Sequence, residues 1–294
     1  MLDDRDLAFF EAARPALRGL AYRILGSFAE AEDAVQDTFL KWQAAERTAV
    51  EVPQAWLTTV CTRRCLDMLK AADRARVDYV GPWLPEPVQT VAEAAPAELA
   101  ASVTTAFLLL LDRLSAKERA AYLLREIFDH DYAEVAQILG VQEATCRKLV
   151  SRAQVALRAG KPRQAVPAAR QEQLLDAFQL AISSGATAPL SALLADDIAL
   201  RADGGGKATA ATRALHGRDE VLSFLTKVLG RAWPKWRQER REINGVLGMV
   251  VYEGDIIRAS VTFGFDDAGA LSDIYIMRNP EKFGGLAAAV GRLN

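Results

Sequence analysis

The chain has 294 residues, of which 51% are apolar, 25% charged and 7% aromatic. This length corresponds to two domains or three small ones, and the apolar content excludes an intrinsically disordered chain. The net charge of -2, from 36 basic and 38 acidic residues, excludes a uniformly basic nucleic-acid binder. Any nucleic-acid surface must therefore come from a local concentration of charge.

The chain shows no sign of a membrane segment, an export signal or a disulfide framework. The longest apolar run, Phe107 to Leu111, is far shorter than the ~20 residues that span a bilayer. The N-terminus is acidic where a secretory signal would be basic, so we expect a cytoplasmic protein. Cys61 and Cys65 lie four apart on a predicted helix with no His nearby. We interpret them as small apolar residues, with a metal or redox pair as the alternative. We expect no metal and no cofactor.

Residues 1–78 are predicted to form helices separated by short breaks. Apolar residues recur at helical spacing from Phe9 to Leu25, and Ser27 with Glu30 predicts a capping box for the next helix. The polar side of that helix, residues 30–37, is acidic and suits a basic protein partner better than DNA. A third helix starts at Pro53 and places basic residues close after Trp56, a pattern that suits unstacked bases. An ordinary solvated helix face is the alternative.

Residues 79–96 are predicted to be an extended linker, because Pro82, Pro85 and Pro87 disfavour a helix. A bare spacer would not carry Trp83 and Leu84 among its prolines. We expect both side chains to dock on another part of the chain, with packing on their own domain as the alternative.

Residues 97–162 are predicted to form a helical domain with a helix-turn-helix. A helix from Tyr132 stops at Gly140, where the chain can take a left-handed turn, and a second helix follows. The second helix has a predicted buried stripe: Cys146, Leu149, Val150, Ala153 and Leu157. Its other face is basic and polar, and no acid occurs from Ala144 to Gln171. This pattern is typical of a helix in a DNA major groove, with an ordinary solvated helix as the alternative.

Residues 163–294 are predicted to form an α+β domain with a curved antiparallel sheet. The predicted helices lie near 174–183, 190–194 and 218–229, and the predicted strands at 198–202, 246–252, 256–265 and 271–277. Turn residues at 253–255 and 266–269 separate the last three strands.

This domain also holds candidate acid–base groups: His216, Asp203, Asp255 and Asp273, with Tyr252 and Tyr275 as donors. The stretch from Asp203 to Lys207 lacks the spacing of a phosphate-binding loop, and its three glycines are more simply a flexible turn. We interpret His216 as a loop or pocket-edge residue, and we expect no catalytic residues and no enzyme.

Three motifs followed by the helix-turn-helix resemble the extracytoplasmic function (ECF) sigma factors: AEDAVQDTF at 31–39, AWL at 55–57 and LSAKER at 114–119. The resemblance covers residues 1 to about 160. It implies a region-2-type domain that binds the β′ clamp of core RNA polymerase and reads the −10 element, and a region-4-type domain that reads the −35 element. Core RNA polymerase, through its β′ clamp and β flap, and promoter DNA are the implied partners.

Motifs at 79–87, 203–207 and 279–282 resemble the ECF subgroup with a fused C-terminal SnoaL-like domain. That resemblance implies a domain that modulates the sigma factor in cis. SnoaL-like cones often enclose a pocket, so a small ligand of unidentified chemistry is a further candidate partner.

The resemblance also implies roles for individual residues. The implied core-polymerase contacts are Asp33, Gln36, Asp37, Phe39 and Trp42. The implied −10 contacts are Trp56, Arg63, Arg64, Lys70 and Arg74, and the implied −35 contacts are Arg147, Lys148, Ser151 and Arg152. The implied intramolecular contacts are Trp83, Leu84, Pro85, Asp203, Lys207, Asn279, Pro280 and Lys282. Many ECF sigma factors carry Asn where Arg63 stands, which leaves the −10 base contacts open.

Two other classes of function compete with this interpretation. A ligand-responsive helix-turn-helix regulator that does not bind core polymerase would have no use for the acidic helix at 30–37. An enzyme fused to a DNA-binding module would depend on His216 or Asp203 for turnover.

Overall fold

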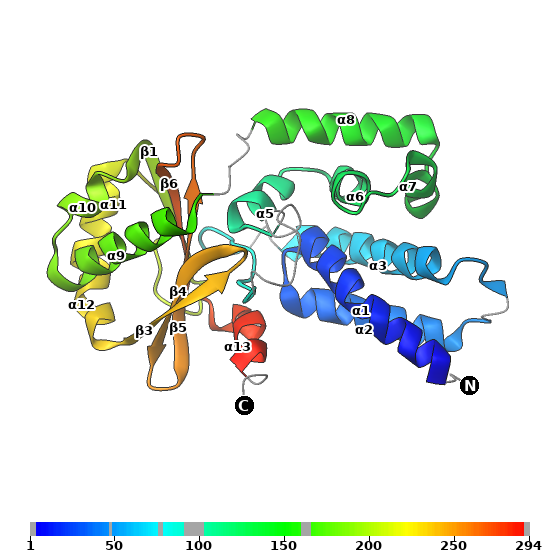
Figure 1. Cartoon of the computed structure of the whole chain (residues 1–294), viewed down its shortest axis with the longest axis horizontal. Coiled ribbons are helices and arrows are strands. Elements are labelled where there is room, and N and C mark those ends of the chain that lie inside the picture. The colour runs from blue at the N-terminus through cyan, green and yellow to red at the C-terminus, as the bar shows by residue number, and fades with distance from the viewer. Residues whose placement is uncertain (1–3, 47–48, 76–78, 91–102, 160–165, 291–294) are drawn as a thin grey trace. The chain divides into compact units, whose positions relative to one another are not determined.

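The computed structural model describes residues 4–46, 49–75, 79–90, 103–159 and 166–290, which form two compact units (Figure 1). The N-terminal unit comprises residues 1–77 and 110–160, and the C-terminal unit comprises residues 78–109 and 161–294. The division falls inside helix α5 (Thr105–Leu111). The described part of the predicted linker therefore belongs to the same unit as the C-terminal sheet.

The N-terminal unit is helical. Its elements are α1 (Asp4–Leu25), α2 (Phe28–Ala44), α3 (Pro53–Ala75), α6 (Ala116–Tyr122), the π-helical turn η4 (Leu123–Ile127), α7 (Tyr132–Leu139) and α8 (Glu143–Ala159). Ser27 caps α2 by accepting a hydrogen bond from the Glu30 N–H at 3.1 Å, so the predicted N-cap is confirmed. Apolar faces of α1, α2 and α3 meet in a core that includes Leu17, Val35 and Leu57.

The predicted helix-turn-helix is present as α7 and α8. Asp131 and Glu134 form a capping box at the start of α7, and Gly140 ends it with φ of 62°, a conformation that costs glycine nothing. Helix α8 buries Cys146, Val150, Ala153 and Leu157. The sequence pattern thus located the turn and most of the buried face, but Leu149 of the predicted stripe is only half-buried.

The C-terminal unit is α+β. Its helices are α9 (Ala168–Ser184), α10 (Ala188–Ser191), α11 (Arg218–Phe224), the π-helical turn η5 (Leu225–Leu229), α12 (Gly230–Ala232) and α13 (Gly284–Val290), with short 3-10 turns at Trp233–Lys235 and Pro280–Lys282. Its strands are β1 (Leu194–Asp203), β2 (Leu215–His216), β3 (Arg237–Ile243), β4 (Val246–Glu253), β5 (Ile256–Phe265) and β6 (Leu271–Met277). They form one six-stranded sheet in the order β2-β1-β6-β5-β4-β3.

The expectation of an antiparallel sheet is wrong at one place, because β1 pairs with β6 in parallel. The other pairings are antiparallel. A parallel pair needs a long crossover connection, and the chain between β1 and β6 supplies it with α11 and a three-stranded meander. The sequence located β4, β5 and β6 but could not reveal how β1 joins them.

The two faces of the sheet are covered differently. Helices α9 to α11 cover one face (Figure 1), where Phe178, Trp233 and Phe263 lie in the main core. The other face is covered by the linker, the start of α5 and the C-terminal tail, which contribute Leu84, Ala106, Phe283 and Leu286 to a second apolar cluster. The linker is thus part of the fold of the C-terminal unit. No helix in the described ranges is long and apolar enough to cross a membrane.

Candidate polymerase and DNA interfaces and the linker site

The acidic helix α2 exposes part of the residue set implied for polymerase binding. Asp33 and Gln36 are exposed, while Asp37 and Phe39 are half-buried. Trp42 is only 2% exposed; its indole N–H donates to the carbonyl of Asp6. Trp42 therefore packs in the core of the unit in this conformation, and its contact with polymerase stays a prediction.

Helix α3 carries the residue set implied for the −10 element, and two of its arginines are engaged within the unit. Arg64 Nε donates to Asp37 Oδ2 at 2.6 Å, which links α3 to the acidic helix. Lys70 is exposed and pairs with Asp67, while Trp56 is half-buried. The side chain of Arg74 lies outside the described residues.

Arg63 contacts the helix-turn-helix. Its Nε donates to the carbonyl of Ile138 at 3.0 Å and its Nη2 to the carbonyl of Gln137 at 3.1 Å. Both carbonyls lie in the last turn of α7, where the helix dipole concentrates partial negative charge. The residue implied for −10 recognition is therefore engaged by the first helix of the helix-turn-helix in this conformation.

Arg119 makes a second contact between the two helical parts of the N-terminal unit. It is 5% exposed. Its Nη1 donates to the carbonyl of Ile24 at 2.7 Å and its Nη2 to Asp112 at 2.9 Å. Ile24 lies in the last turn of α1, so this arginine also reaches the negative end of a helix. No sequence pattern identified either arginine as a link between the two parts.

Helix α8 exposes the whole residue set implied for the −35 element: Arg147, Lys148, Ser151 and Arg152. Arg147 donates from Nε and Nη2 to Glu143 Oε1, at 3.2 and 2.6 Å. Its guanidinium carbon lies 4.2 Å from the ring centroid of Tyr132. The result is a basic surface on the N-terminal part of the second helix of the helix-turn-helix.

In the C-terminal unit, a buried carboxylate binds the linker. Asp203, at the end of β1, is 0% exposed. It accepts hydrogen bonds from the Tyr79 hydroxyl at 2.6 Å, the Leu84 N–H at 2.8 Å and Lys282 Nζ at 2.8 Å. Lys282 Nζ also donates to the Leu84 carbonyl at 2.8 Å. We call Asp203, Lys282, Tyr79 and Leu84 the Asp203 node.

The surroundings of the Asp203 node explain the residue types beside it. The Lys282 ammonium lies 4.9 Å from the ring centroid of Tyr79 and 4.5 Å from that of Trp83, within the range of a cation–π interaction. A Cβ at Gly205 would lie 2.3 Å from the Asn279 side-chain nitrogen, so only glycine fits.

Burial first, and then the Asp203 carboxylate, raise the pKa of Tyr79 above its ordinary value.

Of the other residues implied for intramolecular contacts, Asn279 lies beside the node and donates to the Tyr79 hydroxyl at 3.1 Å. Pro85 is buried, whereas Pro280 is exposed. Lys207 pairs with Glu281 at the surface. The structure thus brings together Trp83, Leu84, Asp203, Asn279 and Lys282, and it leaves Lys207 and Pro280 outside the node.

Asn244 is a linker contact that sequence reasoning missed. Its side chain accepts from the Val88 N–H at 3.0 Å and donates to the Val103 carbonyl at 2.9 Å. Its backbone N–H donates to the Val88 carbonyl at 2.9 Å. Asn244-Gly245 between two strands signals a tight hairpin turn. Nothing in the sequence indicates that this turn binds the linker at Val88 and the chain beyond the linker at Val103.

The candidate acid–base groups do not converge on a common site. Asp203 is engaged in the node, and Asp273 pairs with Arg201. Tyr252 and Tyr275 lie in the apolar cluster under the linker. His216 is exposed on β2 and Asp255 is exposed in a turn. In the described part of the chain, no three His, Cys, Asp or Glu side chains are grouped to hold a metal ion.

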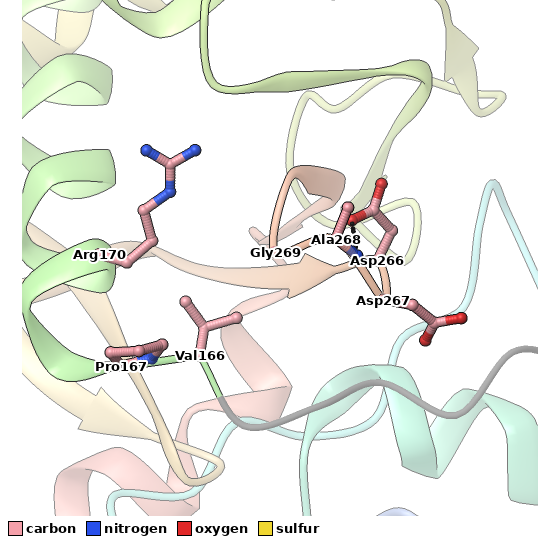
Figure 2. Close-up of a pocket in the computed structure, with 7 residues that line it drawn as sticks. All are labelled: Val166, Pro167, Arg170, Asp266, Asp267, Ala268 and Gly269. Atoms are coloured by element: carbon pink, nitrogen blue, oxygen red, sulfur yellow. Dashed lines mark hydrogen bonds between the residues drawn. The ribbon is translucent and has the colours of Figure 1, made fainter.

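A hollow of about 410 Å³ lies beside the start of α9 (Figure 2). It is lined by Val166, Pro167, Arg170, Asp266, Asp267, Ala268 and Gly269. Asp266 accepts hydrogen bonds from the Ala268 and Ala270 N–H groups, so its carboxylate is used to hold the turn. A small ligand for this unit stays a prediction.

Comparison with known proteins gives matches over both units. Residues 9–75 match the family described as Sigma-70 region 2, and residues 104–157 match Sigma-70, region 4. The chain is 37% identical over 256 residues to the ECF RNA polymerase sigma factor SigJ of Mycobacterium tuberculosis, covering 83% of this chain and 80% of that protein. It is 33% identical over 182 residues to the probable ECF RNA polymerase sigma factor SigI of the same species, covering 60% of this chain and 63% of SigI.

The crystal structure of Mycobacterium tuberculosis SigJ is similar over both units. It superposes with a TM-score of 0.75 at 32% identity, covering 95% of this chain and 98% of SigJ. The similarity therefore includes the C-terminal α+β unit as well as the two sigma regions.

Proposed function

The chain belongs to the ECF RNA polymerase sigma factors of the sigma-70 family, and we propose that its C-terminal unit modulates promoter recognition in cis by holding the linker. Sigma factors bind core RNA polymerase and promoter DNA and are initiation factors, not enzymes. Family membership excludes both a regulator independent of core polymerase and an enzyme with an incidental DNA-binding module.

Within this function, we assign the polymerase contact to the exposed acidic side of α2. Asp33 and Gln36 are exposed there, and the Arg64–Asp37 ion pair connects this side to α3. We assign −10 recognition to α3, with Trp56 and Lys70 beside Arg63 and Arg64. Phe39 and the buried Trp42 support this side of α2 from within the unit.

We assign −35 recognition to the exposed basic face of α8. Arginine can contact phosphates or donate two hydrogen bonds to guanine in the major groove. We expect Arg152→Ala to weaken promoter binding by ~1 to 3 kcal/mol, measured as the dissociation constant of the holoenzyme. Arg113→Ala, a change at an exposed arginine of the same unit outside α8, is the matched control and should bind like wild type. Equal affinity of the Arg152→Ala and wild-type proteins would contradict the assignment.

The modulation in cis rests on one observation: Asp203, fully buried, accepts hydrogen bonds from both Tyr79 and Leu84 of the linker. The linker connects the two promoter-reading domains along the chain, so its conformation limits their separation. Because the C-terminal unit binds the linker at Asp203 and Asn244, fewer linker residues are free to span the distance between the two domains. We further propose, from the motifs at 203–207 and 279–282, that the unit is a SnoaL-like domain used for binding the linker.

Run-off transcription from fragmented genomic DNA with purified core RNA polymerase tests this proposal. Wild-type protein should give discrete, protein-dependent transcripts that identify the promoters. Asp203→Asn should change their yield or selection, whereas Asp255→Asn, a change at an exposed aspartate of the same unit, should not. Identical transcripts from wild type and Asp203→Asn would contradict modulation through the node and leave the sigma-factor function intact.

A further inference from the structure

Arg147 is the most constrained of the exposed cations on α8. Two of its nitrogens donate to one carboxylate oxygen of Glu143, one turn earlier on the same helix. Its guanidinium lies over the face of Tyr132, the first residue of α7, with 4.2 Å between the guanidinium carbon and the ring centroid. The side chain is therefore held from two helices at once.

Tyr132 holds a second arginine as well. The guanidinium carbon of Arg125 lies 5.0 Å from the same ring centroid, and Arg125 Nη1 donates to the His130 carbonyl at 2.9 Å. Two cations on one aromatic ring repel each other, so the ring contact and the Glu143 carboxylate have to offset that repulsion. An arginine in this position has much of its rotamer freedom removed before any DNA arrives.

We propose that Tyr132 and Glu143 are positioning residues that orient the Arg147 guanidinium for promoter DNA. This inference rests on the proposed role of α8 at the −35 element. The Nε and Nη2 groups are used by Glu143, and among the described contacts Nη1 makes no hydrogen bond within the protein. Both N–H groups of Nη1 and the second N–H of Nη2 remain to donate to a base or a phosphate. Their direction is set by the ring and the carboxylate.

The two positioning residues differ in their expected effect. An exposed cation–π contact is worth about two- to fivefold in an equilibrium constant, so we expect Tyr132→Leu to weaken promoter binding by about that factor. Tyr132→Phe keeps the face and should bind like wild type. Glu143→Gln removes a negative charge near the DNA and should bind unrelated DNA equally or more tightly, while discrimination between the promoter and a −35-substituted promoter falls.

A double-mutant cycle with holoenzyme and a promoter duplex tests the inference, with the full chain melted as a folding control. Tyr132→Leu should cost about two- to fivefold in the wild-type background and nothing further in the Arg147→Ala background. An equal loss in both backgrounds, or a loss from Tyr132→Phe as large as that from Tyr132→Leu, would overturn the positioning role. If Tyr132→Leu melts early, unchanged discrimination by Glu143→Gln would overturn it instead.

The cycle also separates this inference from the proposal beneath it. If Arg147→Ala weakens promoter binding but Tyr132→Leu has the same effect in both backgrounds, only the positioning role is contradicted. If Arg147→Ala binds the promoter like wild type, the assignment of Arg147 to the −35 element is contradicted, and the positioning role is contradicted with it.

Discussion

The contact of Arg63 with α7 and the Asp203 node join segments that are distant in sequence, and in both a cationic side chain donates to backbone carbonyls. Arg63 donates to Ile138 and Gln137, and Lys282 donates to Leu84. Their surroundings are opposite. Arg63 is exposed to solvent, whereas Lys282 is 8% exposed and its partner Asp203 is 0% exposed.

This difference in exposure indicates which contact can be replaced by contacts with water or DNA. An exposed arginine loses little when it leaves its protein acceptors, because water or a DNA phosphate replaces them. A buried carboxylate or ammonium that loses its partner has no such replacement and keeps the full cost of desolvation. We therefore expect the Arg63 contact to open when promoter DNA binds, and the Asp203 node to stay closed throughout initiation.

The largest expected effect is that of Asp203→Asn. The substitution removes the charge of the carboxylate that pairs with Lys282, and breaking a buried ion pair costs about 3 to 5 kcal/mol. Hydrogen exchange at the Leu84 and Val88 amides measures it, because both amides donate to side chains of the C-terminal unit. Asp255→Asn is the control. Wild-type protection of both amides in Asp203→Asn would show that the node does not hold the linker.

Arg119→Ala tests the buried contact of the N-terminal unit. The substitution removes the guanidinium and with it the charge-assisted hydrogen bonds to Ile24 and Asp112. We expect the free energy of unfolding of the N-terminal unit to fall by about 2 to 3 kcal/mol. Hydrogen exchange in α1 and α6 is the measurement, and Arg113→Ala, an exposed arginine just before α6, is the control. If hydrogen exchange in both variants equals that of wild type, the buried contact of Arg119 is no stronger than an exposed one.

The Asp203 node should also weaken at alkaline pH through Tyr79. Burial, and then Asp203, raise the pKa of this phenol above its ordinary value. A raised pKa in the folded state means that the stabilisation is complete below the ordinary tyrosine pKa of about 10 and is lost as pH rises above it.

The urea midpoint of the C-terminal unit between pH 8 and pH 11 measures this effect. Wild type should lose more stability over that range than Tyr79→Phe, which has no phenol to ionise. Parallel losses in the two proteins would mean that the phenol does not contribute to the node.

Local features of the fold could be predicted from the sequence, because short-range physics sets them. Gly140 marks the end of α7, and the cap at Ser27 marks the start of α2. Apolar runs separated by turn residues mark the three strands β4 to β6. The basic face of α8 could be found in the same way, since helical periodicity alone separates it from Cys146 and Val150.

The pairings between distant segments could not be predicted. The parallel pairing of β1 with β6 depends on a crossover of the whole intervening chain, and the burial of Trp42 depends on how α1 packs over α2. Arg63, Arg119 and Asn244 each bind backbone carbonyls or amides of a distant segment, and every residue possesses such groups. A sequence pattern therefore gives no information about which carbonyl an arginine will reach.

The smallest expected effect is that of Arg63→Ala. Two hydrogen bonds are lost, but the carbonyls of Gln137 and Ile138 can turn to water, so we expect the N-terminal unit to lose no more than about 1 kcal/mol. Lys70→Ala, an exposed cation on the same helix that pairs only with Asp67 among the described contacts, should lose less. Hydrogen exchange in α3 and α7 measures both. If Arg63→Ala lowered the free energy of unfolding by several kcal/mol, this exposed contact would be as strong as the Asp203 node. There would then be no reason to expect that DNA can open it.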